Sequence, residues 1–263
     1  MNASELYKAG KLQAAIDAQI LEVKAKPADP SLRTFLFELA AFSGDLDRAK
    51  RQIEAVKYDD AERDTAVLQY RVLLECEEKR RRLFRDGLAP RFLDNPPAHL
   101  SIRLEALAAL RAGKPAEALA LLAKANDQPA IVGTLNNKPF KELRDADDLF
   151  GTVIEVMARG DYFWVALEQL DSLTSNAPRF PRDLLYLPAR LTTREGEDAE
   201  VFLPTLYPNS HLHPDDKVKL GTATDWKDAE GGPVSGIGAK TFLVGEDGIG
   251  LIEWRELKLA HRD

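Results

Sequence analysis

The chain has 263 residues, of which 44% are hydrophobic and 30% charged, a balance that is typical of a folded globular protein and excludes a disordered one. Its formal net charge of -7 argues against nucleic acid as the main partner, because phosphate binding requires a concentrated positive field. Cys76 is the only cysteine and cannot form an internal disulfide, which favours a reducing compartment.

The N-terminal segment, residues 1–15, has no basic stretch followed by an apolar core, so we expect no secretory signal. No apolar run approaches the roughly 20 residues that a membrane-spanning helix needs. We therefore expect a cytoplasmic protein without a membrane partner.

Two segments of the first 50 residues repeat a pattern. Residues 10–15 and 44–49 both contain a glycine, a polar residue, a leucine and, three positions later, an alanine. The offset is 44 − 10 = 34 residues, the length of a tetratricopeptide repeat. Glycine suits the positive φ of a turn between paired helices, and alanine lets those helices approach closely. With a weaker third match at residues 112–119, the pattern predicts a tetratricopeptide-like α-α superhelix.

The helices around this repeat have recognisable ends. Asp29 and Pro30 supply a cap and a first-turn proline for a helix with one apolar stripe, formed by Leu32, Phe35, Leu36, Leu39 and Phe42. One long helix is expected from Asp59 to Arg85, and a further pair over 98–124 after a break at 94–97. We expect the helical domain to cover residues 1–125.

The second half, residues 126–263, is expected to form a small antiparallel, barrel-like domain, which places the whole chain in the α+β class. The pattern predicts a helix over 145–158, stopped at Gly160, and a short helix between His213 and Gly221. It also predicts an aromatic strand at 162–165. Two hairpins are expected, one that joins 184–193 to 199–206 and one that joins 240–244 to 249–259.

Candidate chemistry in this half is weak. His211 and His213, with Asp215 and Asp216, have the residue types of a metal site, but the surrounding run is typical of a loop with capping carboxylates. The loop 231–238 before Lys240 resembles a phosphate loop, yet Ala239 stands where glycine is required and a strand follows. We interpret it as a flexible loop that enters a hairpin.

Other candidates also favour structural roles. The basic run Lys79–Arg82 with Arg85 follows three glutamates at helical spacing, so we interpret it as a solvated helix face. Trp164, Trp226 and Trp254 are expected in the core. No nucleophile elbow or carboxylate pair stands out, and we expect neither enzymatic activity nor a cofactor or bound metal.

Several strings across nearly the whole chain resemble the ImpE/TagJ family, in the family's order. They are residues 32–39 followed by 44–49, Pro139-Phe140 followed by 145–147, the segments 162–165, 203–208 and 224–226, and the ending 241–244 through 253–257. The resemblance implies an accessory protein of bacterial type VI secretion that binds the N-terminal helix of the small sheath subunit (TssB/VipA) and influences sheath handling by the ClpV ATPase. It implies no catalytic residues.

In paired-helix repeats the first helix of each pair lines the concave face. On the helix from Pro30, the residues expected to face such a groove and contact a partner helix are Thr34, Glu38, Ala41 and Phe42. Phe42 is equally well interpreted as a core residue. Two alternatives remain open: a helical-repeat adaptor of another bacterial pathway, or an enzyme whose site lies around His211, His213, Asp215 and the loop 231–238.

Overall fold

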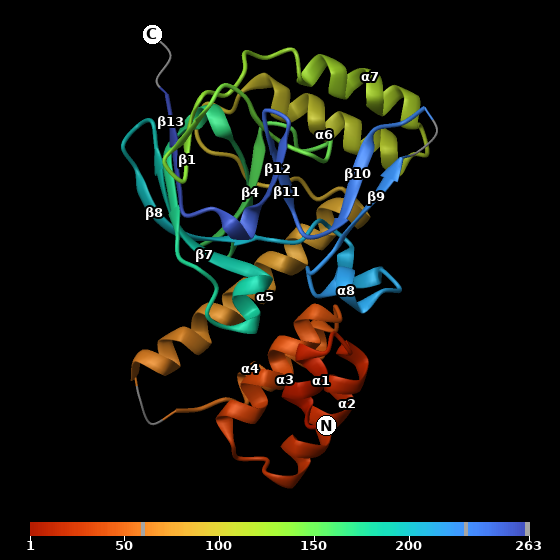
Figure 1. The fold of residues 1–263 in the computed structure, drawn as a ribbon, viewed down its shortest axis with the longest axis vertical. Helices are drawn as coiled ribbons and strands as arrows, with labels where there is room; N and C mark the ends of the chain where they lie inside the picture. Colours follow the sequence, from red (N-terminus) through yellow and green to blue (C-terminus); the bar gives the residue numbers. More distant parts are fainter. Residues whose placement is uncertain (59–60, 229–230, 261–263) are drawn as a thin grey trace.

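The computed structural model describes residues 1–58, 61–228 and 231–260. Helices α1 to α4 form one end of the molecule, the long helix α5 crosses it diagonally, and a β-sheet with helices α6 and α7 forms the other end (Figure 1). The predicted α+β class, with helices first and an antiparallel sheet after them, is confirmed.

The first four helices form two antiparallel pairs, α1 (Ala3–Lys8) with α2 (Leu12–Ala25) and α3 (Pro30–Phe42) with α4 (Leu46–Glu54). The turn glycines Gly10 and Gly44 have φ of 72° and 81°, as the repeat pattern predicts. Ala15 and Ala49 are fully buried between the helices. Asp29 caps α3, and its side chain accepts from the backbone N–H groups of Ser31 and Leu32.

Helix α5 (Ala61–Asp86) is the single long helix that was expected, although the predicted start at Asp59 lies outside the described residues. Helices α6 (Ala98–Arg111) and α7 (Pro115–Ala125) form a third pair with Gly113 in the turn at φ 71°. This pair lies with the sheet and not on α4 (Figure 1). A continuous superhelix over residues 1–125 is therefore not confirmed, and the division of the chain at residue 125 stays a prediction.

Arg103 shows why α6 lies there. Its side chain is fully buried and donates to the carbonyl oxygens of Asp148 and Leu149, 3.2 and 3.1 Å away, and to Asn126 Oδ1 at 2.6 Å. A buried guanidinium must be hydrogen-bonded, so these acceptors fix α6 to the sheet.

The main sheet has eight antiparallel strands in the order β2-β1-β13-β6-β7-β8-β4-β5. Their bounds are β1 (Gly133–Leu135), β2 (Lys138–Phe140), β4 (Val153–Ala158), β5 (Asp161–Ala166), β6 (Leu170–Ser175), β7 (Tyr186–Thr193), β8 (Asp198–Pro204) and β13 (Glu256–Leu259). The edge strands β2 and β5 do not pair with each other, so the sheet is open. The closed, barrel-like shape that we expected is not found among the described strands.

Smaller elements complete the second half. They are the three-stranded sheet β12-β11-β3, with β3 (Leu143–Asp145), β11 (Thr241–Val244) and β12 (Asp247–Gly250), the hairpin β9 (Thr224–Asp228) and β10 (Val234–Gly238), helix α8 (Asp216–Lys219), and the 3-10 turns η1 (Leu167–Gln169), η2 (Pro181–Leu184), η3 (Ser210–Leu212) and η4 (Leu251–Glu253). Within the described residues, none of the helices combines the length and the apolar character that crossing a bilayer requires.

The helix predicted over residues 145–158 is wrong. Residues 143–145 form β3, turns follow, and 153–158 form β4, which pairs with β5 along its whole length. Apolar residues three and four apart suggested a helix, but β4 is buried on both faces, which replaces the alternation of a half-exposed strand with a continuous apolar run.

Strand β4 separates two apolar cores. Val153 and Met157 belong to the core shared with the helices, whereas Ile154 and Val156 belong to the core on the opposite face of the sheet. Glu155 lies between Val153 and Met157 in the sequence and therefore points toward helix α5. A carboxylate thus enters the interface between the helices and the sheet.

Candidate functional site

The structure places Thr34 and Glu38, two of the four predicted partner-binding residues, on the wall of a groove of about 480 Å³. The groove lies between α3, α4, α5 and the segment around η2, and its lining residues are Ser31, Thr34, Phe35, Glu38, Ile53, Tyr58, Val67, Tyr70, Phe180 and Arg182. Most of these side chains are apolar or aromatic. The groove can therefore accept apolar side chains from another chain.

An ion pair forms the polar part of this groove. Arg182 donates from Nη1 to Glu38 Oε1 at 2.5 Å, and its guanidinium carbon lies 4.0 Å from the Phe180 ring centre and 4.7 Å from that of Tyr70. Burial raises the pKa of Glu38, and Arg182 opposes this shift. The segment from Asn176 to Leu185 is thereby fixed across α3.

Sequence reasoning missed this contribution of Phe180 and Arg182, because 144 residues separate Glu38 from Arg182. The only local signal is an aromatic residue directly before Pro181 in a polar stretch. Phe180 remains 49% exposed at the rim of the groove.

Ala41 and Phe42, the other two predicted residues, are 4% and 1% exposed. The Phe42 ring packs against Tyr7 with ring centres 6.1 Å apart, as the core interpretation of Phe42 expects. Both residues line a separate cavity of only about 30 Å³. The structure therefore brings Thr34 and Glu38 together at the groove and places Ala41 and Phe42 away from it.

A buried ionic network lies under α5. Arg80 donates from Nε and Nη2 to the two carboxylate oxygens of Glu155, at 2.7 and 3.0 Å, and Lys240 Nζ lies 2.7 Å from Glu155 Oε2. Tyr162 also donates to Glu155, and Lys240 pairs with Asp145 at 3.4 Å. Burial alone would raise the pKa of Glu155, but Arg80 and Lys240 outweigh it and lower this pKa to about 2.

The network corrects two expectations. Arg80 is 5% exposed, so it does not belong to a solvated face, and Lys240 after the expected loop is 2% exposed. The flexible loop expected over 231–238 is also wrong, because Val234–Gly238 form strand β10. The basic run is mixed: Arg81 pairs with Glu77 one turn earlier at 2.9 Å, as helical spacing predicts, while Arg80 points into the protein. Opposite charges at helical spacing are compatible with an arginine that pairs on its own helix and with one that points into the protein. Arg80 points inward because Glu155 lies beneath α5.

The histidine segment has structural partners. His211 packs on Gly44, and burial, with Arg81 nearby, lowers the pKa of His211 to about 4. His213 Nε2 lies 3.3 Å from Asp225, and Asp215 caps α8 by accepting from the Lys217 N–H. The described residues contain no group of three or more histidine, cysteine, aspartate or glutamate side chains placed to hold a metal ion.

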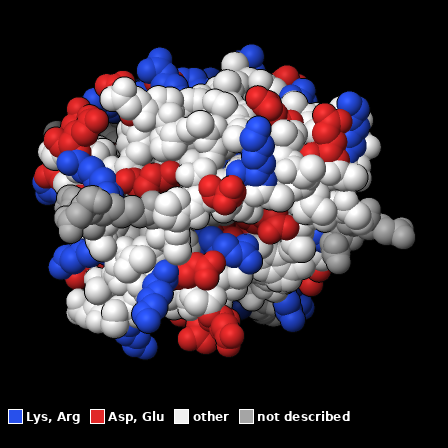
Figure 2. All heavy atoms as spheres, turned by 90° about the horizontal axis from the view of Figure 1, so that it is seen from above, with Lys and Arg blue, Asp and Glu red and all other residues white. Residues whose placement is uncertain are grey.

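The tryptophans differ in burial. Trp164 and Trp254 are fully buried, as expected, but Trp226 is 40% exposed and contacts the Tyr207 ring edge-on at 5.8 Å, so the expected core position of Trp226 is wrong. Strand β9 lies in a two-stranded hairpin, and its residues Asp225, Trp226 and Lys227 are exposed. On the face that Figure 2 shows, basic and acidic side chains are interspersed with uncharged surface.

Two sequence comparisons and one solved structure relate the chain to known proteins. The model of the ImpE protein family matches residues 137–258. The type VI secretion system accessory component TagJ of Pseudomonas aeruginosa PAO1 is 36% identical over 264 aligned positions, which cover 100% of this chain and 92% of that protein. The crystal structure of protein VPA1032 from Vibrio parahaemolyticus superimposes with a TM-score of 0.88 at 24% identity, covering 99% of this chain and 98% of that one, and so shares the fold.

Proposed function

The chain belongs to the ImpE family, and we propose that it is a non-enzymatic accessory protein of a type VI secretion system that binds the N-terminal helix of the small sheath subunit in the groove lined by Thr34 and Glu38. Its similarity to TagJ over the whole chain supports the secretion role. We include in this proposal a cytoplasmic location and an indirect influence on sheath handling by ClpV.

The observation that carries the binding site is the apolar wall of the groove. Phe35 on α3, Ile53 on α4 and Val67 on α5 all line it, and they belong to three different helices. A bound amphipathic helix would place anchors at i, i+3, i+4 and i+7 against such a wall. A single short helix buries a small area, so we expect micromolar affinity, about -8 kcal/mol at 1 μM.

The ion pair refines the partner's chemistry. Glu38 already has Arg182 as its partner, so the partner helix has no need of a basic residue to neutralise it. Thr34 Oγ1 donates to the Pro30 carbonyl oxygen at 2.9 Å and lies 3.3 Å from the Tyr58 hydroxyl, which leaves its methyl group as an apolar contact. We therefore propose that the groove selects mainly for apolar shape.

The test is calorimetric titration of a synthetic peptide with the sequence of the sheath subunit's N-terminal helix. Wild type is expected to bind it, and Thr34→Arg and Ser31→Arg to weaken binding at least about tenfold, because a long cation would fill the apolar groove. Ser101→Arg on α6, an exposed serine far from the groove, is the matched control. The site is disproved if both groove variants bind like wild type, and helix capture is disproved if wild type does not bind.

Other observations distinguish this proposal from an adaptor of another pathway and from an enzyme. Adaptors of another pathway would lack sheath and ClpV genes in their gene neighbourhood. An enzyme with a site near His211 would need reachable polar groups, whereas the polar groups that the structure gathers there are used in packing on Gly44 and in capping α8. These contacts favour the binding role.

A further inference from the structure

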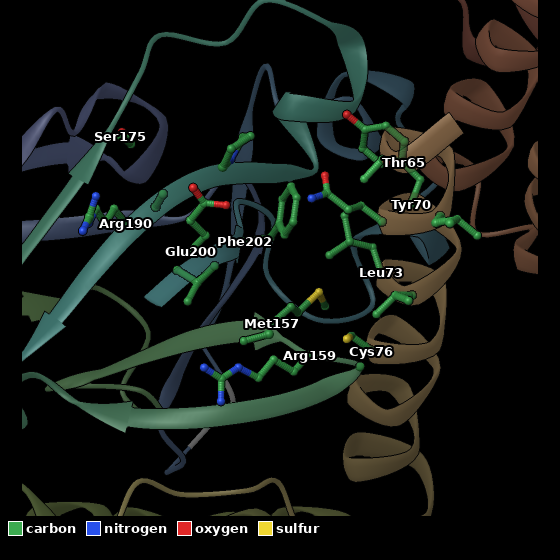
Figure 3. A pocket seen from close by; sticks show the side chains of 18 of the residues that line it. Thr65, Tyr70, Leu73, Cys76, Met157, Arg159, Ser175, Arg190, Glu200 and Phe202 are labelled. Carbon is green, nitrogen blue, oxygen red and sulfur yellow. The ribbon is translucent and has the colours of Figure 1, made fainter. Parts of the chain in front are cut away.

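A second and larger hollow, of about 680 Å³, lies between α5 and strands β4, β7 and β8 (Figure 3). Leu73 on α5 faces Met157 and Phe202 on the strands across it. Two residues of α5 one helical turn apart, Leu68 and Val72, line this cleft and remain 56% and 39% exposed. An exposed apolar ridge beside a cleft with both apolar and polar walls is typical of an interaction surface.

The rim of the cleft carries charged side chains of both signs. Arg190 pairs with Asp198 at 2.7 Å, and Glu200 adds a further negative charge beside it. Arg159 also lines the cleft and is exposed, and it forms no ion pair with any residue that the structure describes. An incoming acidic group would find its partner at Arg159.

Arg159 is held in place although it is exposed. It occupies the tight turn between β4 and β5 with φ 51°, which is the left-handed region that non-glycine residues rarely adopt. Lys79 on α5 ties this turn to the helix by donating to the Gly160 carbonyl oxygen at 2.6 Å and pairing with Asp161 at 2.6 Å. The turn therefore presents Arg159 at a fixed position beside Val72, whose methyl group lies next to Gly160.

We propose that this cleft is a second docking surface, which binds an amphipathic helix of another protein with an acidic residue beside its apolar stripe. Leu68 and Val72 form a ridge with the i, i+4 spacing that packs between side chains of a second helix. The acidic residue pairs with Arg159. The cleft and the groove lie on different faces of α5, although Tyr70 lines both of them.

The experiment uses three designed peptides of about 18 residues, or five helical turns, titrated against the full chain. They share one leucine stripe and carry glutamate, glutamine or lysine beside it. The glutamate peptide is expected to bind at least about tenfold more tightly than the lysine peptide, a difference of about 1.4 kcal/mol. Equal binding of the three peptides, or no binding of the glutamate peptide at about 1 mM, would overturn the proposal.

Variants then locate the peptide. Leu68→Asp is expected to weaken binding at least about tenfold, whereas Leu21→Asp, at a leucine of α2 that is 66% exposed, leaves it unchanged. Arg159→Asp introduces a residue type that tolerates positive φ, and we expect it to abolish the preference of the protein for the glutamate peptide. The control Arg179→Asp, at another exposed arginine, is expected to keep that preference. Circular dichroism verifies that each variant is folded. Binding that is lost in Thr34→Arg but retained in Leu68→Asp would place the peptide in the groove and contradict the second surface.

Discussion

Gly44 differs from the other turn glycines in what surrounds it. A Cβ atom at Gly44 would lie 2.2 Å from the His211 ring, whereas one at Gly113 would meet nothing within 4 Å, and both residues have positive φ. We expect Gly113→Ala to cost about 1–2 kcal/mol from backbone strain alone. Gly44→Ala is expected to cost about 1–3 kcal/mol more through overpacking. Urea denaturation measures both, and equal losses would show that His211 does not pack on this turn in solution.

Arg80 and Arg82 lie on the same helix but in different environments. The Arg80 side chain is 7% exposed and pairs with a buried glutamate, while the Arg82 side chain is 49% exposed and 3.9 Å from Asp86. Arg80→Met removes two hydrogen bonds to Glu155, which keeps Lys240, and one to the Leu206 carbonyl oxygen, so we expect a loss of about 1.5–3 kcal/mol. Arg82→Met is expected to cost under about 1 kcal/mol. The same urea experiment compares them, and similar losses would contradict a network that stabilises the interface.

At the scale of elements, the sequence predicts the helices better than the sheet. Gly-x-Leu repeats, Asp29 with Pro30, and the spacing of apolar residues determine α2, α3 and α4 through contacts within about 15 residues. The hairpins β7–β8 and β11–β12 are found close to their predicted turns, because tight turns are local. The single strand predicted over 249–259 is wrong, because β12 ends at Gly250 and residues 256–259 form β13 of the main sheet. Strand β4 is wrongly predicted as a helix although its hairpin with β5 is local, because burial of both faces removes the alternation of a half-exposed strand.

The candidate site is likewise predictable from sequence only where local contacts determine it. Thr34 could be placed on the groove from helix geometry, but Arg182 and Phe180 come from a segment that only the folded sheet brings to α3. Ala41 was assigned to the groove although it lies one turn too far along α3, where the helix is already covered by η3 and α5. The sequence shows which face of a helix a residue lies on, but not how far along the helix that face stays open to a partner.

The contact between η3 and the α3–α4 turn predicts a pH effect. The pKa of His211 falls to about 4 in the folded protein, against about 6.5 when unfolded, so below pH 6.5 the unfolded state binds a proton that the folded state does not. Stability from this residue is therefore present above pH 6.5 and is lost as pH falls toward 4. We expect the stability difference between wild type and His211→Gln to shift in favour of the variant between pH 7.5 and about 5. A difference independent of pH would show that His211 is exposed to solvent in the folded state.

At the scale of the whole molecule, several polar contacts among the described residues tie the first helices to the rest. They include Arg182 with Glu38, Asp216 accepting from the Leu12 N–H at 2.8 Å, and Arg81 donating to the Gly44 carbonyl oxygen at 2.8 Å. The Leu12 N–H lies at the N-terminus of α2 and the Gly44 carbonyl oxygen lies in the α3–α4 turn, where backbone groups lack partners within a helix. The groove is therefore built from both halves of the chain, and a partner bound there contacts both.

Hydrogen exchange of the full chain, measured by mass spectrometry with and without the peptide of the sheath subunit's N-terminal helix, tests the central claim most directly. Residues 55–58 and 177–180 are irregular segments that border the groove, and their amides are expected to exchange more slowly when the peptide is bound. Amides of α6 and α7 are expected to stay unchanged. Protection confined to α6 and α7, or no change anywhere with saturating peptide, would contradict binding of the sheath helix in this groove.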